Sequence, residues 1–244
     1  MLFQGPGFST SRLKGPTFKI KMKGRINEIF ESIQGEGLYL GEKQLFVRFA
    51  GCNLSCSFCD TNHQKFREYE SFELFEEIQR RKNGHHSVSF TGGEPLLQKD
   101  FLKEVLILNR SNRYRNYLET NGTLADALEE IIDLVDIIAM DLKLPSSTGL
   151  NGCWQEHRRF LEIAYHKEVF IKSVICNSTT EEDFRLALGL INDHGKSVLL
   201  ILQPNSREDQ NILKEKLDKF KGIAKEENVA VCVIPQMHKI VGVK

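Results

Sequence analysis

The sequence predicts an α/β fold in which helices join the strands of a largely parallel sheet, and three observations support this prediction. From Gln44 onward, near-continuous apolar runs alternate with stretches whose apolar residues recur at helical spacing. The apolar runs are rich in Val, Ile, Leu and Phe, which is typical of parallel strands covered by helices. Polar motifs follow nearly every run. The alternation implies right-handed crossovers and allows an open sheet or a full or partial barrel, with functional groups at the carboxyl ends of the strands.

The expected elements follow these runs in chain order. The expected strands are 44–50, 87–91, 116–119, 137–143, 169–176, 198–203 and 229–235. Helical stripes are expected at 74–78, 128–135, 184–191 and 213–224, with a further helix near Phe101 that Pro95 would begin. Thr180 with Asp183 predicts a capped start for the third stripe. The basic residues between Lys14 and Arg25 are expected to form a solvated tail and an edge strand.

Composition and charge exclude several broad classes of protein. A chain of 244 residues with 41% hydrophobic residues is long enough to bury one substantial core. Its formal net charge of zero gives no overall electrostatic case for binding nucleic acid or an anionic membrane. No apolar run approaches the roughly 20 residues that cross a bilayer, so we expect no membrane contact.

Cysteine usage and the first residues bear on location and on domain organisation. Six cysteines, three of them clustered, fit a reducing compartment better than a disulfide framework, so we expect a cytoplasmic protein. Cys176 and Cys232 lie in apolar runs and are expected to be small core residues, whereas Cys153 has no assigned role. The opening MLFQGP resembles a protease site used to remove tags, so 1–15 are expected to be an expression leader. Residues 16–244 are expected to form a single domain.

The most informative motif is a run of three cysteines directly after the first expected strand. Cys52, Cys56 and Cys59 have the spacing CxxxCxxC, which can hold three corners of a four-iron, four-sulfur cluster. The fourth iron would then lack a protein ligand and could chelate the amino and carboxylate groups of S-adenosylmethionine, which indicates radical chemistry. His63 allows a second interpretation, a structural Cys₃His zinc site. Free cysteines in a loop are a third.

Other polar motifs stand at the ends of the following expected strands, where simple turns would suffice. They are Thr91-Gly92-Gly93-Glu94-Pro95, Glu119-Thr120-Asn121-Gly122, Asp141-Leu142-Lys143, Gln203-Pro204 and Gln236-Met237-His238-Lys239. Lys172 lies within the fifth expected strand. Gly92 and Gly93 leave the backbone bare, so it could approach the amino group of S-adenosylmethionine closely. A single convergent site explains this pattern.

Together these motifs resemble the radical S-adenosylmethionine superfamily and, within it, the family of 7-carboxy-7-deazaguanine synthases. The discriminating elements are SIQGEG at 32–37 and CDT at 59–61, beside 46–54, 91–95, 119–123 and 236–239. The resemblance implies a partial, open β/α barrel, a homodimer, a [4Fe–4S] cluster, S-adenosylmethionine and Mg²⁺. It also implies an enzyme that converts 6-carboxy-5,6,7,8-tetrahydropterin to 7-carboxy-7-deazaguanine and ammonia, in the biosynthesis of queuosine and related 7-deazapurines. A flavodoxin or ferredoxin would supply the electron.

The resemblance assigns roles to single residues, motif by motif. Substrate would be bound by Ile33, Gln34, Gly35, Glu36, Arg48, Thr91 and His238. S-adenosylmethionine would be surrounded by Phe58, Cys59, Asp60, Gly93, Glu119, Asp141, Leu142, Lys143 and Gln203. The cluster would be held by Cys52, Cys56 and Cys59. Arg48 would pair with the substrate carboxylate, and Thr61 would be a hard oxygen ligand of Mg²⁺.

Several of these residues also have simpler interpretations. Arg48 could form a buried ion pair, and residues 34–37 could form a hairpin turn. Thr61 could cap a turn, and His238 could be a packing histidine.

The sequence also departs from the family pattern. Phe58 stands where Trp is common, and 141–143 replaces the Ser-Pro-Lys of many members. The carboxylate of Lys244 could reach the site. Two other classes remain open, a glycyl-radical activating enzyme, against which QGEG and Thr61 argue, and a non-enzymatic zinc-binding module.

Overall fold

The computed structural model describes residues 22–59, 65–195, 197–237, 239 and 242, and these residues build a nine-stranded sheet of order β3-β1-β2-β4-β5-β6-β7-β8-β9. The expected leader at 1–15 lies outside the described residues. The strands are β1 (Lys23–Ile33), β2 (Lys43–Phe49), β3 (Arg67–Glu70), β4 (Ser87–Gly92), β5 (Asn116–Thr120), β6 (Ile137–Asp141), β7 (Glu168–Ile175), β8 (Leu200–Pro204) and β9 (Val231–Val233). From β2 to β9 neighbouring strands run parallel, whereas β1 pairs antiparallel with β2 and β3. The sheet is not closed, which confirms the predicted α/β fold with an open barrel.

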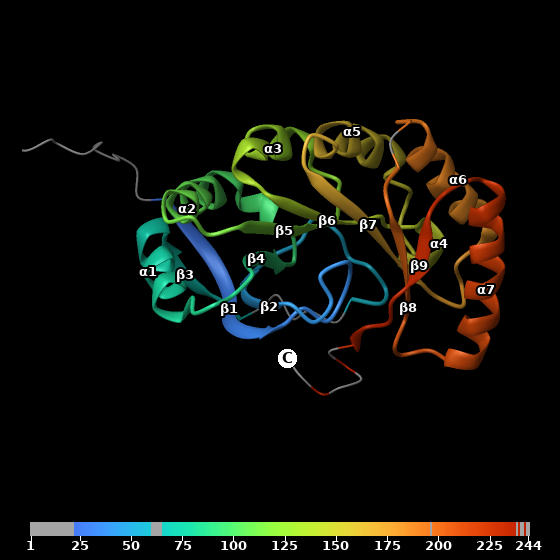
Figure 1. Ribbon diagram of the computed structural model, residues 1–244, viewed down its shortest axis with the longest axis horizontal. Coiled ribbons are helices and arrows are strands. Elements are labelled where there is room, and N and C mark those ends of the chain that lie inside the picture. The colour runs from blue at the N-terminus through green and yellow to red at the C-terminus, as the bar shows by residue number, and fades with distance from the viewer. Residues whose placement is uncertain (1–21, 60–64, 196, 238, 240–241, 243–244) are drawn as a thin grey trace, which may run out of the picture.

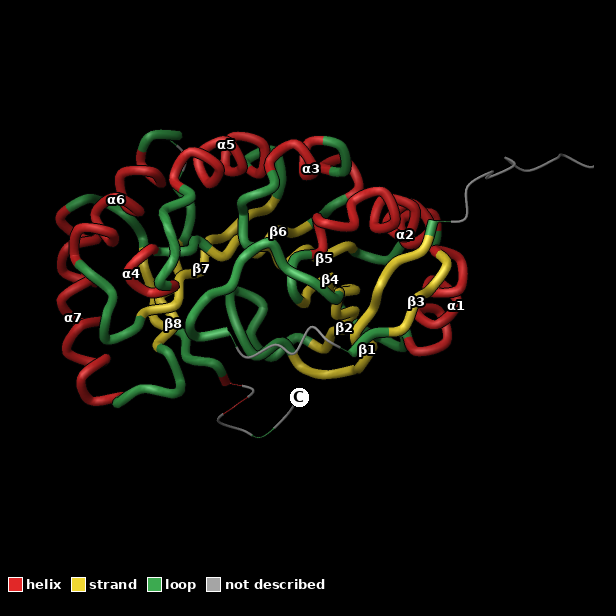
Figure 2. Tube along the Cα trace, turned by 180° about the vertical axis from the view of Figure 1, so that it is seen from behind, coloured by secondary structure: helices red, strands yellow, loops and turns green. Residues whose placement is uncertain are grey.

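Helices follow the parallel strands and lie along the outer side of the curved sheet (Figure 1). They are α1 (Ser71–Arg81), η1 (Pro95–Gln98), α2 (Lys99–Ser111), α3 (Ala125–Glu129), η2 (Ile132–Leu134), α4 (Pro145–Thr148), α5 (Trp154–Ala164), α6 (Glu181–Asn192) and α7 (Gln210–Glu226). The larger hydrophobic core lies between these helices and the sheet. Seen from behind, loops gather on the inner side of the sheet (Figure 2). Within the described ranges, no helix combines the length and apolarity needed to cross a membrane.

The inner face of the sheet has two layers, because alternate side chains of a strand point to the same face. The first layer is a small buried apolar cluster of Tyr117, Ile137, Ala139, Phe170 and Ile201. Two residues beyond members of this cluster, toward the carboxyl ends of the strands, stand Glu119, Asp141, Lys172 and Gln203. The polar strand ends predicted from the sequence therefore meet on one face.

The connection between β1 and β2 folds under this inner face. Gln34 closes it as a hairpin loop, because its N–H donates to the carbonyl of Glu42 at 2.8 Å and its carbonyl accepts from the N–H of Gly41 at 2.8 Å. The ring of Tyr39 packs on Tyr117, with centroids 5.8 Å apart. Residues 34–37 thus belong to a hairpin connection, as their simpler interpretation proposed, and this connection covers the apolar cluster.

Two expectations at the level of the elements are wrong. β1, which contains Arg25, is not an edge strand, because β3 pairs along its outer side from Lys23 to Ile26. Residues 128–135 do not form one helix. The N–H of Ile131 bonds to the carbonyl of Leu128 at 3.0 Å, and the N–H of Leu134 bonds to that of Ile131 at 2.9 Å. After α3 has ended, the chain continues in tight turns with hydrogen bonds between residues three apart. These turns, rather than one long helix, bury the apolar residues of 128–135.

Other expectations hold, and some elements were not foreseen. The hydroxyl of Thr180 accepts a hydrogen bond from the N–H of Asp183 at 3.3 Å and caps α6, as predicted. Cys176 is buried in the core, as predicted. The sequence analysis missed β3, α4 and α5. For α5 a signal was available, because its buried residues recur at helical spacing, namely His157, Phe160, Leu161 and Ala164.

Candidate active site

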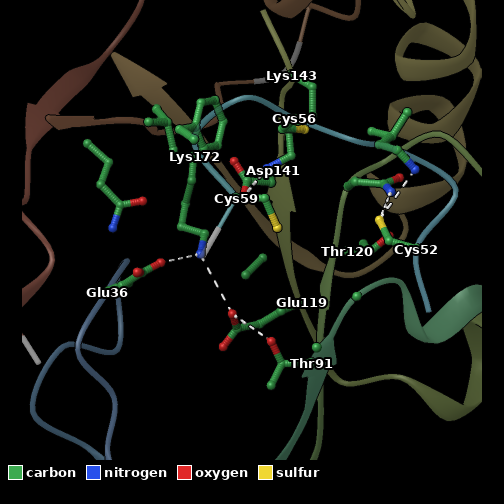
Figure 3. A pocket seen from close by; sticks show the side chains of 18 of the residues that line it. Glu36, Cys52, Cys56, Cys59, Thr91, Glu119, Thr120, Asp141, Lys143 and Lys172 are labelled. Carbon is green, nitrogen blue, oxygen red and sulfur yellow. Dashed lines mark hydrogen bonds and ion pairs between the residues drawn. The ribbon is translucent and has the colours of Figure 1, made fainter. Parts of the chain in front are cut away.

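The cysteine run follows β2 and is held in place by backbone hydrogen bonds to another loop and to a short helix. The N–H of Glu94, after β4, donates to the carbonyl of Gly51 at 2.8 Å. The N–H of Ser57 donates to the carbonyl of Thr148, in α4, at 2.9 Å. All three cysteines of the motif consequently line one pocket, which opens at the carboxyl ends of the parallel strands (Figure 3).

The donor set of this pocket fits a four-iron cluster held at three corners. All six cysteines are free thiols and lie within the described residues. Among those residues, no three Cys, His, Asp or Glu side chains converge on one point for a single ion. A cubane needs no such convergence, since each thiolate binds a different iron atom. Burial raises the pKa of the Cys52 and Cys56 thiols, so their thiolates depend on nearby positive charge, which bound iron supplies.

A buried carboxylate shapes the loop that faces the cysteines. Glu94 is fully buried, and it accepts hydrogen bonds from the N–H of Asn121 at 2.8 Å, the N–H of Leu96 at 3.0 Å and the hydroxyl of Thr120 at 3.0 Å. Asn121 in turn donates through Nδ2 to Asn53 of the cysteine run at 2.8 Å. Burial raises the pKa of Glu94 to about 7, although these hydrogen bonds favour the ionised form.

The glycine pair beside Glu94 brings bare backbone to the pocket. Gly92 has φ of +129°, which side chains rarely adopt, and an added Cβ would lie 2.3 Å from the carbonyl oxygen of Phe49. Only glycine fits this close approach of β4 to β2. Gly93 lines the pocket next to it, where its backbone is within reach of a ligand.

The side of the pocket next to Cys56 gathers several residues expected around S-adenosylmethionine (Figure 3). The ammonium of Lys143 lies 2.9 Å from Asp141 and 5.3 Å from the centroid of the Phe58 ring. Asp141 Oδ1 and Gln203 Nε2 are buried and have no hydrogen-bond partner among the described residues. Two such orphaned groups, an acceptor and a donor, indicate a polar ligand and fit S-adenosylmethionine. The side chain of Leu142 lies in the helix-covered core instead.

The opposite side of the pocket carries residues expected to bind substrate. Glu36, Arg48 and Thr91 all line it. Arg48 already forms an ion pair, since its Nε lies 2.8 Å from Glu28, and the two side chains are 26% and 25% exposed. The hydroxyl of Thr91 donates to Glu119 at 3.3 Å. The alternative role of Arg48 as an ion-paired residue is thus present, but its guanidinium is partly exposed toward the pocket.

Gln34 supports this side from behind. It is buried, and its Nε2 donates to Glu119 at 2.9 Å and to Gln44 at 3.1 Å. Its Oε1 accepts from the N–H of Glu36 at 3.1 Å. Both ends of the amide are therefore used within the protein, and Gln34 orients the two glutamates.

Some predicted site residues lie elsewhere. Ile33, at the end of β1, is 42% exposed, and it does not line the pocket. Gly35 contributes its carbonyl, which accepts from the N–H of Met237 at 3.0 Å and ties the C-terminal segment to the hairpin loop. Asp60, Thr61, His63 and His238 lie outside the described residues.

Lys172 is a pocket residue to which the sequence analysis assigned no role. It stands on β7, and its side chain is only 5% exposed. Its ammonium lies 2.8 Å from Glu36 and 3.7 Å from Glu119, near the centre of the pocket (Figure 3). A signal for it was present in the sequence, because it is the only charged residue in the apolar run 169–176.

Comparison with known proteins identifies the class of this site. The family model of the radical SAM superfamily matches residues 46–215, which contain all three cysteines. The chain therefore belongs to the radical S-adenosylmethionine superfamily and is an enzyme that uses a [4Fe–4S] cluster and S-adenosylmethionine. The fold agrees. The crystal structure of QueE from Escherichia coli superposes with a TM-score of 0.60 at 20% identity, covering 86% of this chain and 93% of that one.

Sequence relatives define the family more narrowly. The 7-carboxy-7-deazaguanine synthase of Geobacter sulfurreducens is 37% identical, over 91% of this chain and 98% of its own. That of Thermoplasma acidophilum is 34% identical, over 88% of this chain and 96% of its own. The chain thus belongs to the 7-carboxy-7-deazaguanine synthase family. A zinc-binding module and a glycyl-radical activating enzyme, which the cysteine spacing also allowed, are not supported.

Loss of one cluster cysteine is expected to remove the cluster. We predict that Cys52→Ala, Cys56→Ala and Cys59→Ala each lose most of the iron bound after anaerobic reconstitution and all turnover, because two thiolates leave the cubane weakly held. Cys153→Ala, which changes a cysteine outside the pocket, should keep its iron and brown colour. Iron and zinc analysis is the measurement. A colourless wild-type protein that carries zinc, or full activity in a single pocket variant, would exclude the cluster.

The raised pKa of Glu94 predicts a pH-dependent stability. An unfolded glutamate has a pKa of 4.5 and the buried one about 7, so between these values the folded protein retains a proton that the unfolded chain releases. The contribution of Glu94 is therefore complete below the lower value and falls as pH rises through this window. Glu94→Gln cannot ionise. The unfolding free energy of Glu94→Gln minus that of wild type, both measured by urea denaturation, should therefore increase by a few kcal/mol from about pH 5 to about pH 8. If the unfolding free energies of wild type and variant changed in parallel with pH, Glu94 would not titrate between about pH 5 and about pH 8.

Proposed function

We propose that this enzyme converts 6-carboxy-5,6,7,8-tetrahydropterin to 7-carboxy-7-deazaguanine and ammonia, in the biosynthesis of queuosine and related 7-deazapurines. The observation that carries the proposal is the composition of one pocket. Glu36, Arg48 and Thr91 line the same cavity as the three cysteines. The names of the relatives support the same reaction.

The pocket residues suit the groups of this substrate. Arg48 can offer guanidinium N–H groups to the substrate carboxylate while its Nε stays with Glu28. Glu36 and Glu119 would be acceptors for ring N–H groups, and the Thr91 hydroxyl is a further polar contact. The resemblance placed Glu119 beside S-adenosylmethionine, but Lys172 bridges it to Glu36 on the substrate side of the pocket. These side chains would fix the pterin carbon that bears the carboxylate toward the cysteine side of the pocket.

The other side of the pocket would hold S-adenosylmethionine. When bound, the cluster would supply the electron for the reductive cleavage of S-adenosylmethionine. This cleavage yields the radical that removes a hydrogen atom from the substrate. Asp141 and Gln203 would use their orphaned polar atoms on the cofactor, and the backbone of Gly93 would meet its amino group. Lys143, paired with Asp141, and the ring of Phe58 would exclude water from this side.

Further features are proposed from the family resemblance. We propose that residues 16–244 form one domain that assembles as a homodimer, and light scattering would test the dimer. A flavodoxin or ferredoxin would donate the electron. We propose a cytoplasmic location, because six free cysteines suit a reducing compartment.

The reaction itself is the first test. Reduced, reconstituted protein incubated with S-adenosylmethionine and 6-carboxy-5,6,7,8-tetrahydropterin should form 7-carboxy-7-deazaguanine, detected by mass spectrometry, because the pocket combines acceptors for the pterin with a cluster site. The cofactor should be regenerated rather than consumed. A sample without reductant is the control. Formation of deoxyadenosine without any deazaguanine product would indicate a radical enzyme of different specificity.

We propose that Thr61 would hold a Mg²⁺ ion, which would supply positive charge for the rearrangement and deprotonation. Mg²⁺ commonly takes one or two protein ligands and completes its sphere with substrate and water. Thr61→Ala should therefore need roughly tenfold more Mg²⁺ for half-maximal product formation, an estimate based on the loss of one ligand contact. Thr180→Ala, at the start of α6, is a threonine control that should leave the titration unchanged. An identical Mg²⁺ response in both variants would remove Thr61 from the metal site.

A further inference from the structure

The inner face of the sheet contains a buried lysine that needs an explanation. Lys172 is 4% exposed and stands on β7 opposite Asp141 of β6. Burying an unpaired ammonium costs several kcal/mol, so a lysine is expected in this layer only where carboxylates surround it. The carboxylate of Asp141 is paired with Lys143, at 2.9 Å.

The partners of Lys172 come from two distant parts of the chain. Glu36 approaches from the β1–β2 connection to 2.8 Å, and Glu119 from β5 to 3.7 Å. Burial by itself lowers the pKa of this ammonium, but the charges of Glu36, Glu119 and Asp141 outweigh it and raise the pKa well above its ordinary value. Lys172 is therefore a fixed positive charge between two carboxylates at neutral pH.

Each of these carboxylates is held on its other side by uncharged donors. Glu119 accepts from Gln34 at 2.9 Å and from Ser89 at 3.2 Å. Glu36 accepts from Nε2 of Gln236, in the C-terminal segment, at 3.0 Å. Hydrogen bonds of this kind orient the carboxylates, but they supply no full charge against the repulsion between them. In the pocket, Lys172 supplies that charge.

We propose that Lys172 is a positioning residue for the substrate: its ammonium holds Glu36 and Glu119 side by side as charged acceptors aimed into the pocket. Two carboxylates that share one lysine can both face the N–H groups of one flat, donor-rich ring. Without the lysine their mutual repulsion would turn one of them away. The identity of the ring rests on the function proposed above, whereas the bridge itself is a feature of this structure.

Three other cations line the pocket, and each has other partners. Arg48 is paired with Glu28 at 2.8 Å, and Lys143 is paired with Asp141. Lys239 donates to Gln236 at 2.7 Å. None of them can replace Lys172 without breaking these contacts. The bridging role therefore falls on Lys172.

Lys172→Met removes the charge at similar length. We expect its kcat/KM for 6-carboxy-5,6,7,8-tetrahydropterin to fall about 10- to 100-fold, mainly through a higher KM, because charge-assisted contacts to the substrate are lost. The ratio of deoxyadenosine to product should rise. Lys99→Met, which breaks the surface ion pair with Glu130, is the matched control and should behave as wild type.

A double-mutant cycle separates positioning from general damage. Because Lys172 acts through the glutamates, Lys172→Met combined with Glu36→Gln should be no more than about threefold worse than Glu36→Gln alone. Lys172→Arg, which keeps the charge, should recover part of the lost kcat/KM. If Lys172→Met does not fold, two comparisons still test the positioning role. They are the kcat/KM of the double variant against that of Glu36→Gln, and the kcat/KM of Lys172→Arg against that of wild type. Multiplicative losses in the cycle, or a wild-type KM in Lys172→Met, would overturn the positioning role. A wild-type enzyme that makes no deazaguanine would instead overturn the proposed function, and this inference with it.

Discussion

The parallel pairing from β2 to β9 is the constraint on which the site depends. Parallel strands end at a common edge, and their side chains alternate between faces. Each of the strands β5 to β8 thereby places an apolar residue and then a polar one on the inner side. Tyr117 precedes Glu119 in this way, and Phe170 precedes Lys172. A slip of one residue in β7 would send Lys172 into the helix-covered core and Ile171 into the pocket. The register that builds the core therefore also builds the site.

The antiparallel strand β1 adds what the parallel strands cannot. Because β1 runs antiparallel to β2, its connection to β2 starts at the amino ends of the parallel strands, away from the pocket. From there the connection crosses beneath the inner face of the sheet. Tyr39 covers the apolar cluster, and Gly37, with φ of +72°, sits so close to Phe170 that an added Cβ would be 2.5 Å from the ring. This packing fixes the depth of the connection. Glu36 consequently meets Lys172 from below, inside the curve of the sheet.

Local patterns in the sequence were sufficient for the parallel strands, most helices and the cysteine pocket, because each depends on periodicity or on tight spacing. They were insufficient where tertiary contacts decide. Leu142 was expected near the cofactor, but it is the residue between Asp141 and Lys143, and alternation sends its side chain into the core. Lys172 went unassigned because its partners are far away in the sequence. The β3 strand is short and polar, so only its pairing with β1 identifies it.

The charges of the inner layer are better explained by binding than by stability. A protein is often at least as stable when apolar side chains of similar volume replace a buried ion pair, because both charges of the pair lose their hydration on burial. The layer below shows that this sheet packs apolar residues without difficulty. Around Lys172, however, two glutamates face one lysine, and each carboxylate oxygen can accept more than one hydrogen bond. A ligand that brings N–H groups can use this remaining capacity, which an apolar layer would not offer. The two glutamates beside one lysine are therefore an argument that this layer binds a donor-rich ligand.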